Sequence, residues 1–383
     1  MNLELSEEQE AVRELAEDFV AREITPHVVA WDRAESVDKS IVKKLGALGF
    51  LGLTIPEEYG GSGGDHLAYC LVTEELGRGD SSVRGIVSVS LGLVAKTIAS
   101  WGDEEQKRRW LPRLTAGEAV GCFALTEPGT GSDAGNLSTR AVRDGDDYVI
   151  NGSKMFITNG TWADVVLLFA RTGDVPGHRG VSAFLVPADT PGLTRRTVHG
   201  KLGLRGQATA ELVLEDVRVP AATLLGPEGK GFSLAMSALA KGRMSVAAGC
   251  VGIAQAALDA AVRYAGEREQ FGQPIAGYQL VQELISDISV DVDAARMLTW
   301  RVADLVDRGQ DFATAASTAK LFASEAAVRA ANNALQVFGG YGYIDEYPVG
   351  KLVRDARVMT LYEGTSQIQK LIIGRALTGV SAF

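Results

Sequence analysis

The sequence predicts an α+β protein in which a β-rich middle region separates two helical regions. Three observations support this prediction. The first part of the chain shows helical capping and periodicity, the middle holds short apolar runs between turn signals, and the last part holds long alanine-rich segments with few breakers. We expect domains at residues 1–120, 121–228 and 229–383.

The N-terminal region is predicted to be helical. Ser6 and Gln9 have the spacing of a capping box, and apolar residues recur on one face of the segment that follows. A glycine-rich loop at 56–65 interrupts this pattern. Two further helical segments are expected at 67–76 and 81–102.

The middle region is predicted to form short antiparallel strands. Asp144-Gly145 and Asn151-Gly152 are hairpin turn signals. Short strands at the observed spacing favour a compact antiparallel sandwich or barrel. The candidate strands are 148–150, 154–158, 165–170, 181–186 and 211–219.

The C-terminal region is predicted to be a helical bundle. This region is rich in alanine, and its segments 246–266, 279–306 and 312–339 are long, with few helix breakers. Alanine-rich helices of this length pack on one another at close distance, so the last third of the chain should form one bundle.

Composition narrows the class of protein. The chain has 383 residues, 46% of them hydrophobic, and a net charge of -10, which disfavours a nucleic-acid partner. Its cysteines are scattered and its histidines lack metal-ligand spacing. The acidic N-terminus lacks the pattern of a targeting signal, and no uninterrupted apolar run approaches the ~20 residues of a bilayer span. We expect a cytoplasmic protein with no metal and no membrane insertion.

Several segments hold residue types that are common at ligand sites, although the chain lacks a P-loop, a Rossmann glycine motif and a GxSxG nucleophile. In 122-CFALTEPGTGSDAGNL-137, glycines and hydroxyls suit a flavin edge or a pyrophosphate, and an ordinary polar turn is equally compatible. The remaining segments are 154-KMFITNG-160, 268-REQFGQPIAGYQL-280, 336-QVFGGYGY-343 and 361-LYEGTSQIQK-370.

Each of these four segments also has a purely structural interpretation. Phe156 and Thr158 are predicted to share one side of a strand, where such pairs usually pack in a core. Arg268 could hold a phosphate and Phe271 could stack on a base, or both could lie in a solvated loop. Gly340 permits close backbone approach to a ligand, or belongs to a helix C-cap.

Glu363 has two interpretations on local grounds. Ser366 and Gln369 have the spacing of a capping box, so Glu363 precedes a short helix, where the helix dipole favours an acid. The alternative is a catalytic base. The local sequence alone favours the helix-start acid.

Taken together in this order and spacing, the TEPGTGSD loop, the KMFITNG strand, the REQFG loop, the QVFGGYGY turn and LYEGTSQIQ resemble the acyl-CoA dehydrogenase family over essentially the whole chain. The resemblance implies an N-terminal helical domain, a middle antiparallel β domain and a C-terminal four-helix bundle. It also implies an FAD-dependent oxidoreductase of fatty acid metabolism that converts an acyl-CoA thioester to its trans-2-enoyl form.

In this family the glutamate of the YEGT motif, here Glu363, removes the α-proton while the β-hydrogen leaves as hydride to flavin N5. The resemblance further implies that the thioester oxygen is held by the backbone N–H of that glutamate and a ribityl hydroxyl of FAD. A carboxylate with a pKa near 4.3 is a poor base, so we expect burial to raise the pKa of Glu363.

The resemblance also assigns contacts. The flavin is expected to meet Phe123, Leu125, Thr126, Gly131, Ser132, Phe156, Thr158, Thr365 and Gln367. The FAD of a neighbouring subunit is expected to meet Arg268, Gln270, Phe271, Gln336 and Gly340, which implies a homotetramer built as a dimer of dimers. The substrate is expected to meet Ser132, Arg243, Tyr362 and Gly364. Electron-transfer flavoprotein is the expected electron acceptor.

Arg84 is unusual because the helical segment around it is otherwise small and apolar. It either points to solvent near a helix start or meets an anion. This stretch is similar to the glutaryl-CoA dehydrogenase branch, in which an arginine and a serine one turn later bind the far carboxylate of the substrate. Arg84 and Ser88 stand at those positions, whereas an acidic residue of that branch is replaced by Gly77.

Three other functions are alternatives to acyl-CoA dehydrogenation. Ala240 stands where relatives often carry an aspartate near Arg243, which leaves open a carrier-protein thioester of a biosynthetic pathway. An oxygen-using acyl-CoA oxidase or nitroalkane-oxidase relative shares the fold, but the nitroalkane enzyme has an aspartate in place of Glu363. A non-catalytic flavin-binding paralogue would be expected to lack the base.

Overall fold

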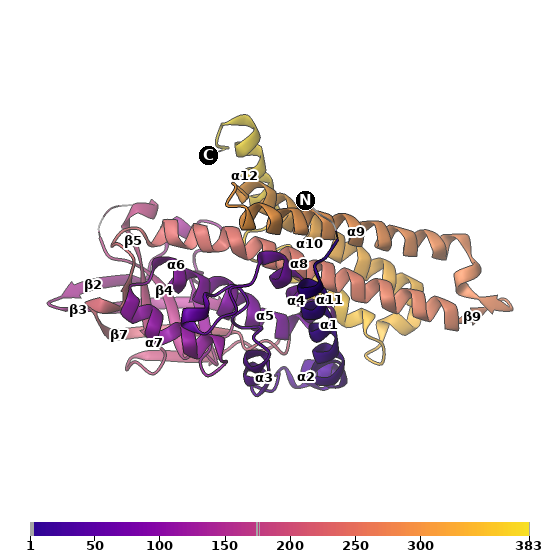
Figure 1. Ribbon diagram of the computed structural model, residues 1–383, viewed down its shortest axis with the longest axis horizontal. Coiled ribbons are helices and arrows are strands. Elements are labelled where there is room, and N and C mark those ends of the chain that lie inside the picture. The colour runs from indigo at the N-terminus through magenta and orange to yellow at the C-terminus, as the bar shows by residue number, and fades with distance from the viewer. Residues whose placement is uncertain (1–3, 174, 176, 383) are drawn as a thin grey trace.

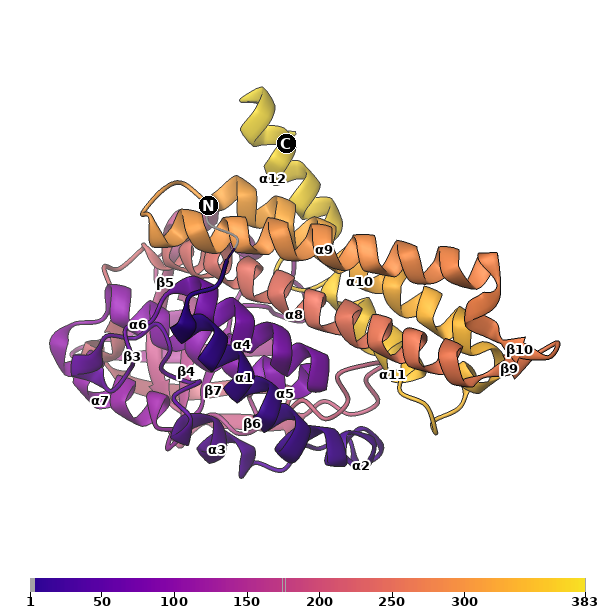
Figure 2. The same ribbon diagram turned by 45° about the vertical axis from the view of Figure 1, so that its right-hand side comes forward.

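A β-sheet lies beside one group of short helices, and a bundle of long helices extends away from both, as a computed structural model of the chain shows (Figures 1 and 2). The structure describes residues 4–173, 175 and 177–382. The α+β fold class and the predicted order of helices, sheet and bundle are confirmed.

The N-terminal helices pack beside the sheet. The predicted capping box is confirmed, because Ser6 Oγ accepts from the Gln9 N–H at 3.2 Å and Gln9 Oε1 accepts from the Ser6 N–H at 2.9 Å. Helices α5 and α6 are joined by a π-helical segment, η4, into one apolar rod. The elements are α1 (Glu7–Phe19), α2 (Val28–Ala34), α3 (Ile41–Ala47), α4 (His66–Gly79), α5 (Ser81–Val89), η4 (Ser90–Ala95), α6 (Lys96–Trp101) and α7 (Glu104–Thr115).

The middle region forms one eight-stranded sheet in the order β6-β7-β3-β2-β4-β5-β8, with β1 added beside β4. Most neighbouring strands are antiparallel, as predicted, but β4 runs parallel to both β1 and β2. The strands are β1 (Gly121–Ala124), β2 (Arg140–Asp144), β3 (Asp147–Ile157), β4 (Val165–Arg171), β5 (Val181–Pro187), β6 (Leu193–Thr197), β7 (Ala210–Pro220) and β8 (Leu224–Leu225).

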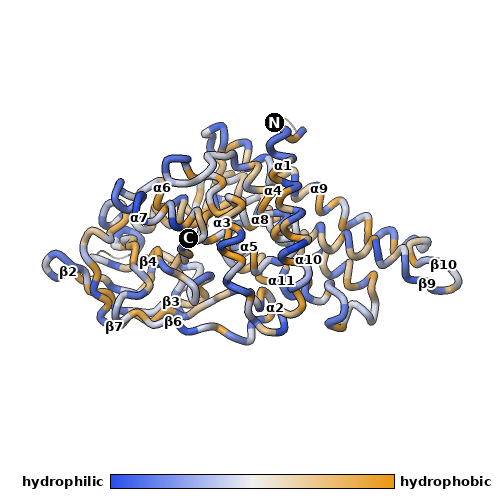
Figure 3. Tube along the Cα trace, turned by 60° about the horizontal axis from the view of Figure 1, so that its bottom comes forward, coloured by the Kyte–Doolittle hydropathy of each residue, from blue (hydrophilic) through white to orange (hydrophobic). Residues whose placement is uncertain are grey.

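One of the two predicted hairpin turns is wrong. Asp144-Gly145 does join β2 to β3, at a hydrophilic tip (Figure 3). Asn151-Gly152 instead lies inside β3, where the register with β7 shifts, so it forms a bulge. A Cβ at Gly152 would lie 2.6 Å from Thr139 Oγ1, which explains why glycine is required there.

The C-terminal helices pack through small side chains. Ala316, Ala319 and Ala323 on α10 are at most 1% exposed, which lets the helix axes come close. Helix α12 projects from the body of the molecule (Figure 1). The elements are α8 (Gly231–Glu267), β9 (Glu269–Gln270), β10 (Gln273–Pro274), α9 (Gln279–Asp307), α10 (Ala313–Phe338), α11 (Val349–Met359) and α12 (Ser366–Thr378).

Two helical stretches, Ser81–Trp101 and Gly231–Glu267, are long and apolar enough to cross a membrane by length and composition. The apolar window is 94% buried inside the protein in the first and 67% buried in the second. Core helices of soluble proteins have the same character, so these helices are explained by packing within the fold.

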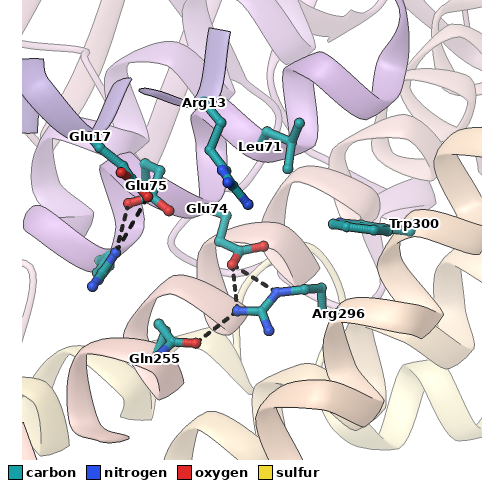
Figure 4. Close-up of a pocket in the computed structure, with 9 residues that line it drawn as sticks. Arg13, Glu17, Leu71, Glu74, Glu75, Gln255, Arg296 and Trp300 are labelled. Carbon is teal, nitrogen blue, oxygen red and sulfur yellow. Dashed lines mark hydrogen bonds and ion pairs between the residues drawn. The ribbon is translucent and has the colours of Figure 1, made fainter. Parts of the chain in front are cut away.

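A charged hollow of about 270 Å³ lies between α1, α4, α8 and α9 (Figure 4). We call it the charged junction, and define it by Arg13, Glu17, Glu74, Glu75, Arg78, Gln255, Arg296 and Trp300. Arg296 donates to Glu74 Oε1 at 2.8 and 3.0 Å and to Gln255 Oε1 at 2.8 Å. Arg78 donates to Glu75 at 3.3 Å. Arg78 Nη1 also lies 3.9 Å from Glu17 Oε1 on α1, so these charged pairs link the four helices.

Candidate active site

Glu363 lies in the short turn between α11 and α12, where the backbone is strained. Its φ is +51°, and the φ of the next residue, Gly364, is +93°. The left-handed region costs a residue with a Cβ about 1–3 kcal/mol, and such strain persists only where the surroundings fix it. Strained residues of this kind cluster at functional sites, so the conformation itself marks Glu363.

Two fully buried side chains fix this turn. Gln369 Nε2 donates to the carbonyl oxygens of Glu363 and Gly364, both at 3.0 Å. Lys320 Nζ, on α10, donates to the same Gly364 oxygen at 2.9 Å. Both Lys320 and Gln369 are 0% exposed. The turn is therefore held from two helices, α10 and α12.

The Glu363 carboxylate faces helix α8. Its Oε2 atom is shielded from solvent and has no hydrogen-bond partner among the described residues. Gly242 makes room for it, since a Cβ there would collide with Oε2 and with Leu93. Burial raises the pKa of Glu363 to about 7, although the positive charges of Arg84, Lys320 and Arg243 oppose the rise. A carboxyl group of this kind can take up and release a proton near neutral pH.

Three buried cations surround this single carboxylate. Arg84 is 1% exposed, Lys320 0% and Arg243 8%. In the described part of the chain none of them forms an ion pair, and Arg243 Nη1 only reaches Ser317 Oγ at 3.4 Å. Burial lowers the pKa of Arg243 and lowers that of Lys320 to about 8. This cluster thus carries an excess of positive charge, which favours an anionic ligand or transition state.

Arg84 points inward, which excludes the solvent-facing alternative. Its Nη1 donates to Ser88 Oγ at 2.7 Å and its Nη2 donates to Tyr362 Oη at 2.6 Å, while Nε has no partner among the described residues. Its Cδ rests against Gly249, where a Cβ would collide with it. The structure therefore brings together Arg84, Ser88 and Tyr362, as expected for a common pocket.

Hydroxyl groups extend this polar patch across three helices. Ser88 Oγ on α5 lies 2.6 Å from Ser245 Oγ on α8. Tyr69 Oη on α4 donates to the same Ser245 oxygen at 3.0 Å. Tyr69 and Ser245 are at most 1% exposed. The interior next to Glu363 is therefore polar, unlike the purely apolar pocket that suits a hydrocarbon chain.

The acid that accompanies the arginine in the glutaryl-CoA dehydrogenase branch has no replacement here. Gly77 packs directly on α8, where a Cβ would lie 2.7 Å from the Gly249 carbonyl oxygen. The two helix backbones touch at this point and leave no room for a side chain. Arg84 consequently stays without a carboxylate partner in the described part of the chain.

The loop after β1 is fixed to strand β3 by a buried ion pair. Lys154 Nζ on β3 lies 2.8 Å from Glu127 Oε1, and the Met155 N–H donates to the Thr126 carbonyl at 2.9 Å. No atom lies within 4 Å of a Cβ built on Gly131. The loop is thus fixed to the sheet, while Gly131 and Ser132 remain exposed.

Phe156 and Thr158 do not follow a regular strand. Phe156 has a φ of +60° at a break in the β3–β7 register and is 63% exposed. Thr158 lies beyond the end of β3, and its Oγ1 hydrogen-bonds to Gln207 Oε1 at 3.2 Å. Simple alternation along a strand is therefore the wrong reason for placing them together. A large exposed ring held in a strained conformation still suits a planar ligand.

The remaining predicted flavin contacts differ in how they are presented. The rings of Phe123 and Phe169 pack at 4.8 Å, and Leu125 is 7% exposed, so these two side chains face the core. Thr365 and Gln367 lie at the start of α12, and Gln367 is exposed. The exposed residues Gly131, Ser132 and Phe156 offer backbone, hydroxyl and aromatic contacts that fit the predicted FAD, whereas the hydroxyls of Thr158 and Thr365 bond within the chain.

The capping box predicted at Ser366 and Gln369 is wrong by one residue. Thr365 is the N-cap, because its side chain accepts from the Ile368 N–H at 3.2 Å. Ser366 Oγ instead donates to Glu325 at 2.5 Å. Gln369 is therefore free to hold the turn of the base, as described above.

A second group of predicted contacts lies at the far end of the bundle. Arg268, Gln270 and Gly340 line a hollow of about 550 Å³ near β9. Phe271 is 95% exposed, and Gln336 is also exposed. Within one chain the structure does not bring this group together with Glu363.

Four residues of the site were missed by sequence reasoning: Lys320, Gln369, Tyr69 and Ser245. Lys320 had a usable signal, because it interrupts the stripe of alanines on the buried face of α10, where a charge needs an explanation. Tyr69 and Ser245 had none, since their contact joins helices far apart in the sequence.

Comparisons with known proteins agree with this geometry. The chain matches the N-terminal domain of acyl-CoA dehydrogenase at residues 6–118, its middle domain at 122–217 and its C-terminal domain at 229–378. It is 49% identical to the probable acyl-CoA dehydrogenase YngJ of Bacillus subtilis, with 98% of this chain and 100% of the relative covered.

Two solved structures are similar over nearly their whole length. The butyryl-CoA dehydrogenase of Megasphaera elsdenii is 41% identical, with a TM-score of 0.96 and coverage of 98% of this chain and 100% of that one. A glutaryl-CoA dehydrogenase of Mycobacterium smegmatis in complex with FADH2 is 37% identical, with a TM-score of 0.95 and coverage of 99% and 96%.

Proposed function

The chain belongs to the acyl-CoA dehydrogenase family, and on that premise we propose that Glu363 is the base that removes the α-proton of its acyl-CoA thioester substrate. Enzymes of this family are FAD-dependent oxidoreductases that act on CH–CH groups. The observation that supports the assignment is the shielded, unpaired Oε2 atom of Glu363, in a carboxyl group whose pKa burial raises to about 7.

The chain's own residues support proton removal in two ways. The Glu363 carboxylate accepts the α-proton, and the surrounding cations favour the negative charge that develops on the thioester. The Glu363 N–H has no acceptor within the described residues, so it is available to donate to the thioester oxygen. FAD, when bound beside Thr126, Gly131, Ser132 and Phe156, supplies the acceptor for the β-hydrogen.

Replacement of the base tests this proposal. Glu363→Gln keeps the size of the side chain and removes its ability to take a proton, so kcat/KM in a dye-linked assay should fall by about 10²–10⁴-fold. Glu325→Gln is a matched control, since Glu325 lies on α10 and bonds Ser366. If Glu363→Gln retains wild-type kcat/KM while binding FAD normally, Glu363 is not the base.

We also propose that the substrate carries a carboxylate at the end of its acyl group. The Arg84 guanidinium is buried and hydrogen-bonds to two hydroxyl groups, but it has no carboxylate partner in the described part of the chain. A buried charge without a counter-ion is costly, so an anion should bind beside it. Overall identity does not separate the classes, because the butyryl-CoA and glutaryl-CoA enzymes are 41% and 37% identical to this chain. Arg84 and Ser88 are therefore the features on which the proposal rests.

Substrate competition tests the role of Arg84. We expect a higher kcat/KM for glutaryl-CoA than for butyryl-CoA in the wild type. In Arg84→Gln the ratio of kcat/KM for glutaryl-CoA to kcat/KM for butyryl-CoA should fall by about 10–100-fold. This change corresponds to the loss of one charge-assisted hydrogen bond. Higher wild-type activity on butyryl-CoA, with a ratio that Arg84→Gln leaves unchanged, would contradict the proposal.

The bundle-end contacts support a proposed homotetramer, built as a dimer of dimers. Arg268 and Gln270 line their hollow far from Glu363, and Phe271 beside them is 95% exposed and so accessible to a neighbouring chain. From the family resemblance we propose electron-transfer flavoprotein as the electron acceptor, and from the composition of the sequence we propose a cytoplasmic location. Light scattering at the mass of four chains, and a lower FAD content in Arg268→Ala, are the expected results. A monomer with full FAD content would contradict the assembly.

A further inference from the structure

The strained turn of the base depends on one buried cation more than on the other two. Of the three cations around Glu363, only Lys320 bonds the backbone of the turn, through the Gly364 carbonyl at 2.9 Å. Arg84 bonds side-chain hydroxyls, and Arg243 reaches only Ser317. Lys320 thus has two effects on the same residue, one through geometry and one through charge.

The geometric effect follows from the backbone of the turn. Glu363 and Gly364 are consecutive residues with positive φ, and the chain relaxes from such a conformation unless it is held. The Gly364 carbonyl receives bonds from both Lys320 and Gln369, while the Glu363 carbonyl receives one from Gln369 alone. Lys320 is the only one of these two supports that comes from a different helix, α10, and therefore fixes the turn relative to the bundle.

The electrostatic effect follows from burial. Lys320 is 0% exposed, and in the described residues no carboxylate lies within ion-pair distance of its ammonium group. Its positive charge is the second largest influence, after Arg84, that opposes the rise in the pKa of Glu363. The charged and titratable groups around this pair are Arg84 on α5, Tyr69 on α4, Arg243 and Cys250 on α8, Glu325 on α10, and Tyr362 in the turn itself.

We infer that Lys320 is a positioning residue for the base: it holds the turn that presents Glu363 to the substrate and keeps the carboxylate in its ionised form. This inference rests on the proposed role of Glu363. It assigns a function to a lysine that the family resemblance left unassigned in the sequence. It also explains why a charged side chain interrupts the buried alanine stripe of α10.

Two substitutions separate the two effects. Lys320→Met removes the charge and the hydrogen bond while keeping most of the buried volume. Gln369→Leu removes the bonds to the Glu363 and Gly364 carbonyls and changes no charge. Lys96→Met is the matched control, because Lys96 is another buried lysine, 6% exposed, that does not bond the turn.

The readout is proton abstraction alone. The FAD-loaded enzyme is incubated in D2O with a 3-thiaacyl-CoA, whose β-sulfur has no hydrogen to lose, and α-deuterium uptake is measured by mass spectrometry from pH 5.5 to 9.5. Removal of the cation raises the pKa of Glu363, so the acidic limb of the Lys320→Met profile should move up by about one pH unit. At pH 6 this shift is a loss of about 10-fold in exchange rate.

The controls decide between the outcomes. Gln369→Leu should lower the rate of α-deuterium uptake at all pH values without moving the acidic limb of the profile. Lys96→Met should leave the acidic limb in place. If Lys320→Met exchanges with the wild-type profile, or only loses rate uniformly as Gln369→Leu does, the inference is overturned and the role of Glu363 stands. If Glu363→Gln exchanges as fast as the wild type, the proposed function fails first, and the inference with it.

Discussion

The charged junction and the pocket around Glu363 both bury ionised side chains, but they treat them differently. In the junction Arg296 binds Glu74 and Gln255, and Arg78 binds Glu75, so each of these arginines meets an acid (Figure 4). Around Glu363, three cations and one acid lie together without an ion pair in the described part of the chain. Removing one partner of a buried pair leaves the other charge uncompensated and destabilises the fold, whereas buried charges that are already unpaired lower its stability and are available to a ligand.

The largest expected effect comes from breaking a pair in the junction. Arg296→Met leaves Glu74, 7% exposed, without its partner, so the free energy of unfolding should fall by about 3 kcal/mol. Arg84→Met is the matched variant in the pocket. This substitution removes a cation that has no carboxylate partner in the described residues. The free energy of unfolding of the variant should therefore stay within about 1 kcal/mol of the wild-type value. Urea denaturation of both variants measures the difference. Equal losses would show that the two regions do not differ as described.

Neutralisation of the base should give the next largest effect, and it should depend on pH. The folded-state pKa of Glu363, about 7, lies above its ordinary value of 4.5. Between these values the folded protein keeps a proton that the unfolded chain has lost, so this group makes stability fall as pH rises through that window. Glu363→Gln does not titrate and should therefore be more stable than the wild type by about 2 kcal/mol at pH 8, with no gain at pH 4.

Thermal midpoints at the two pH values measure this effect. Glu8→Gln, at an exposed position on α1, is the control for the substitution itself. A Glu363→Gln variant that is equally stable or less stable than the wild type at pH 8 would mean that the carboxylate is better paired than the structure indicates. Higher stability of Glu363→Gln at pH 8 would mean that the Glu363 carboxylate lowers the stability of the fold in exchange for its function.

The sequence predicted the elements better than the environments of single residues. The alanine-rich helices and most strands were found because their periodicity is local. Asn151-Gly152 was misplaced because the same dipeptide suits a hairpin turn and a bulge. Glu363 was found through its motif, since its local sequence alone favoured a helix-start acid.

The supports of the site could not be predicted because they depend on contacts between distant segments. Lys320 reaches Gly364 across 44 residues, and Ser88 reaches Ser245 across 157 residues. Arg84 had two interpretations until the structure showed it 1% exposed. The positive φ of Phe156, Phe271 and Glu363 is likewise absent from any sequence pattern, although all three were predicted site residues.

Anaerobic reduction of the bound flavin tests whether Glu363 is the base. Holoenzyme with wild-type FAD content is mixed with excess glutaryl-CoA, and with butyryl-CoA in parallel, while the flavin absorbance near 450 nm is followed. The wild type should bleach with at least one of the two substrates, and Glu363→Gln should not bleach on the same timescale. Bleaching of Glu363→Gln at the wild-type rate would contradict the account and place the base elsewhere.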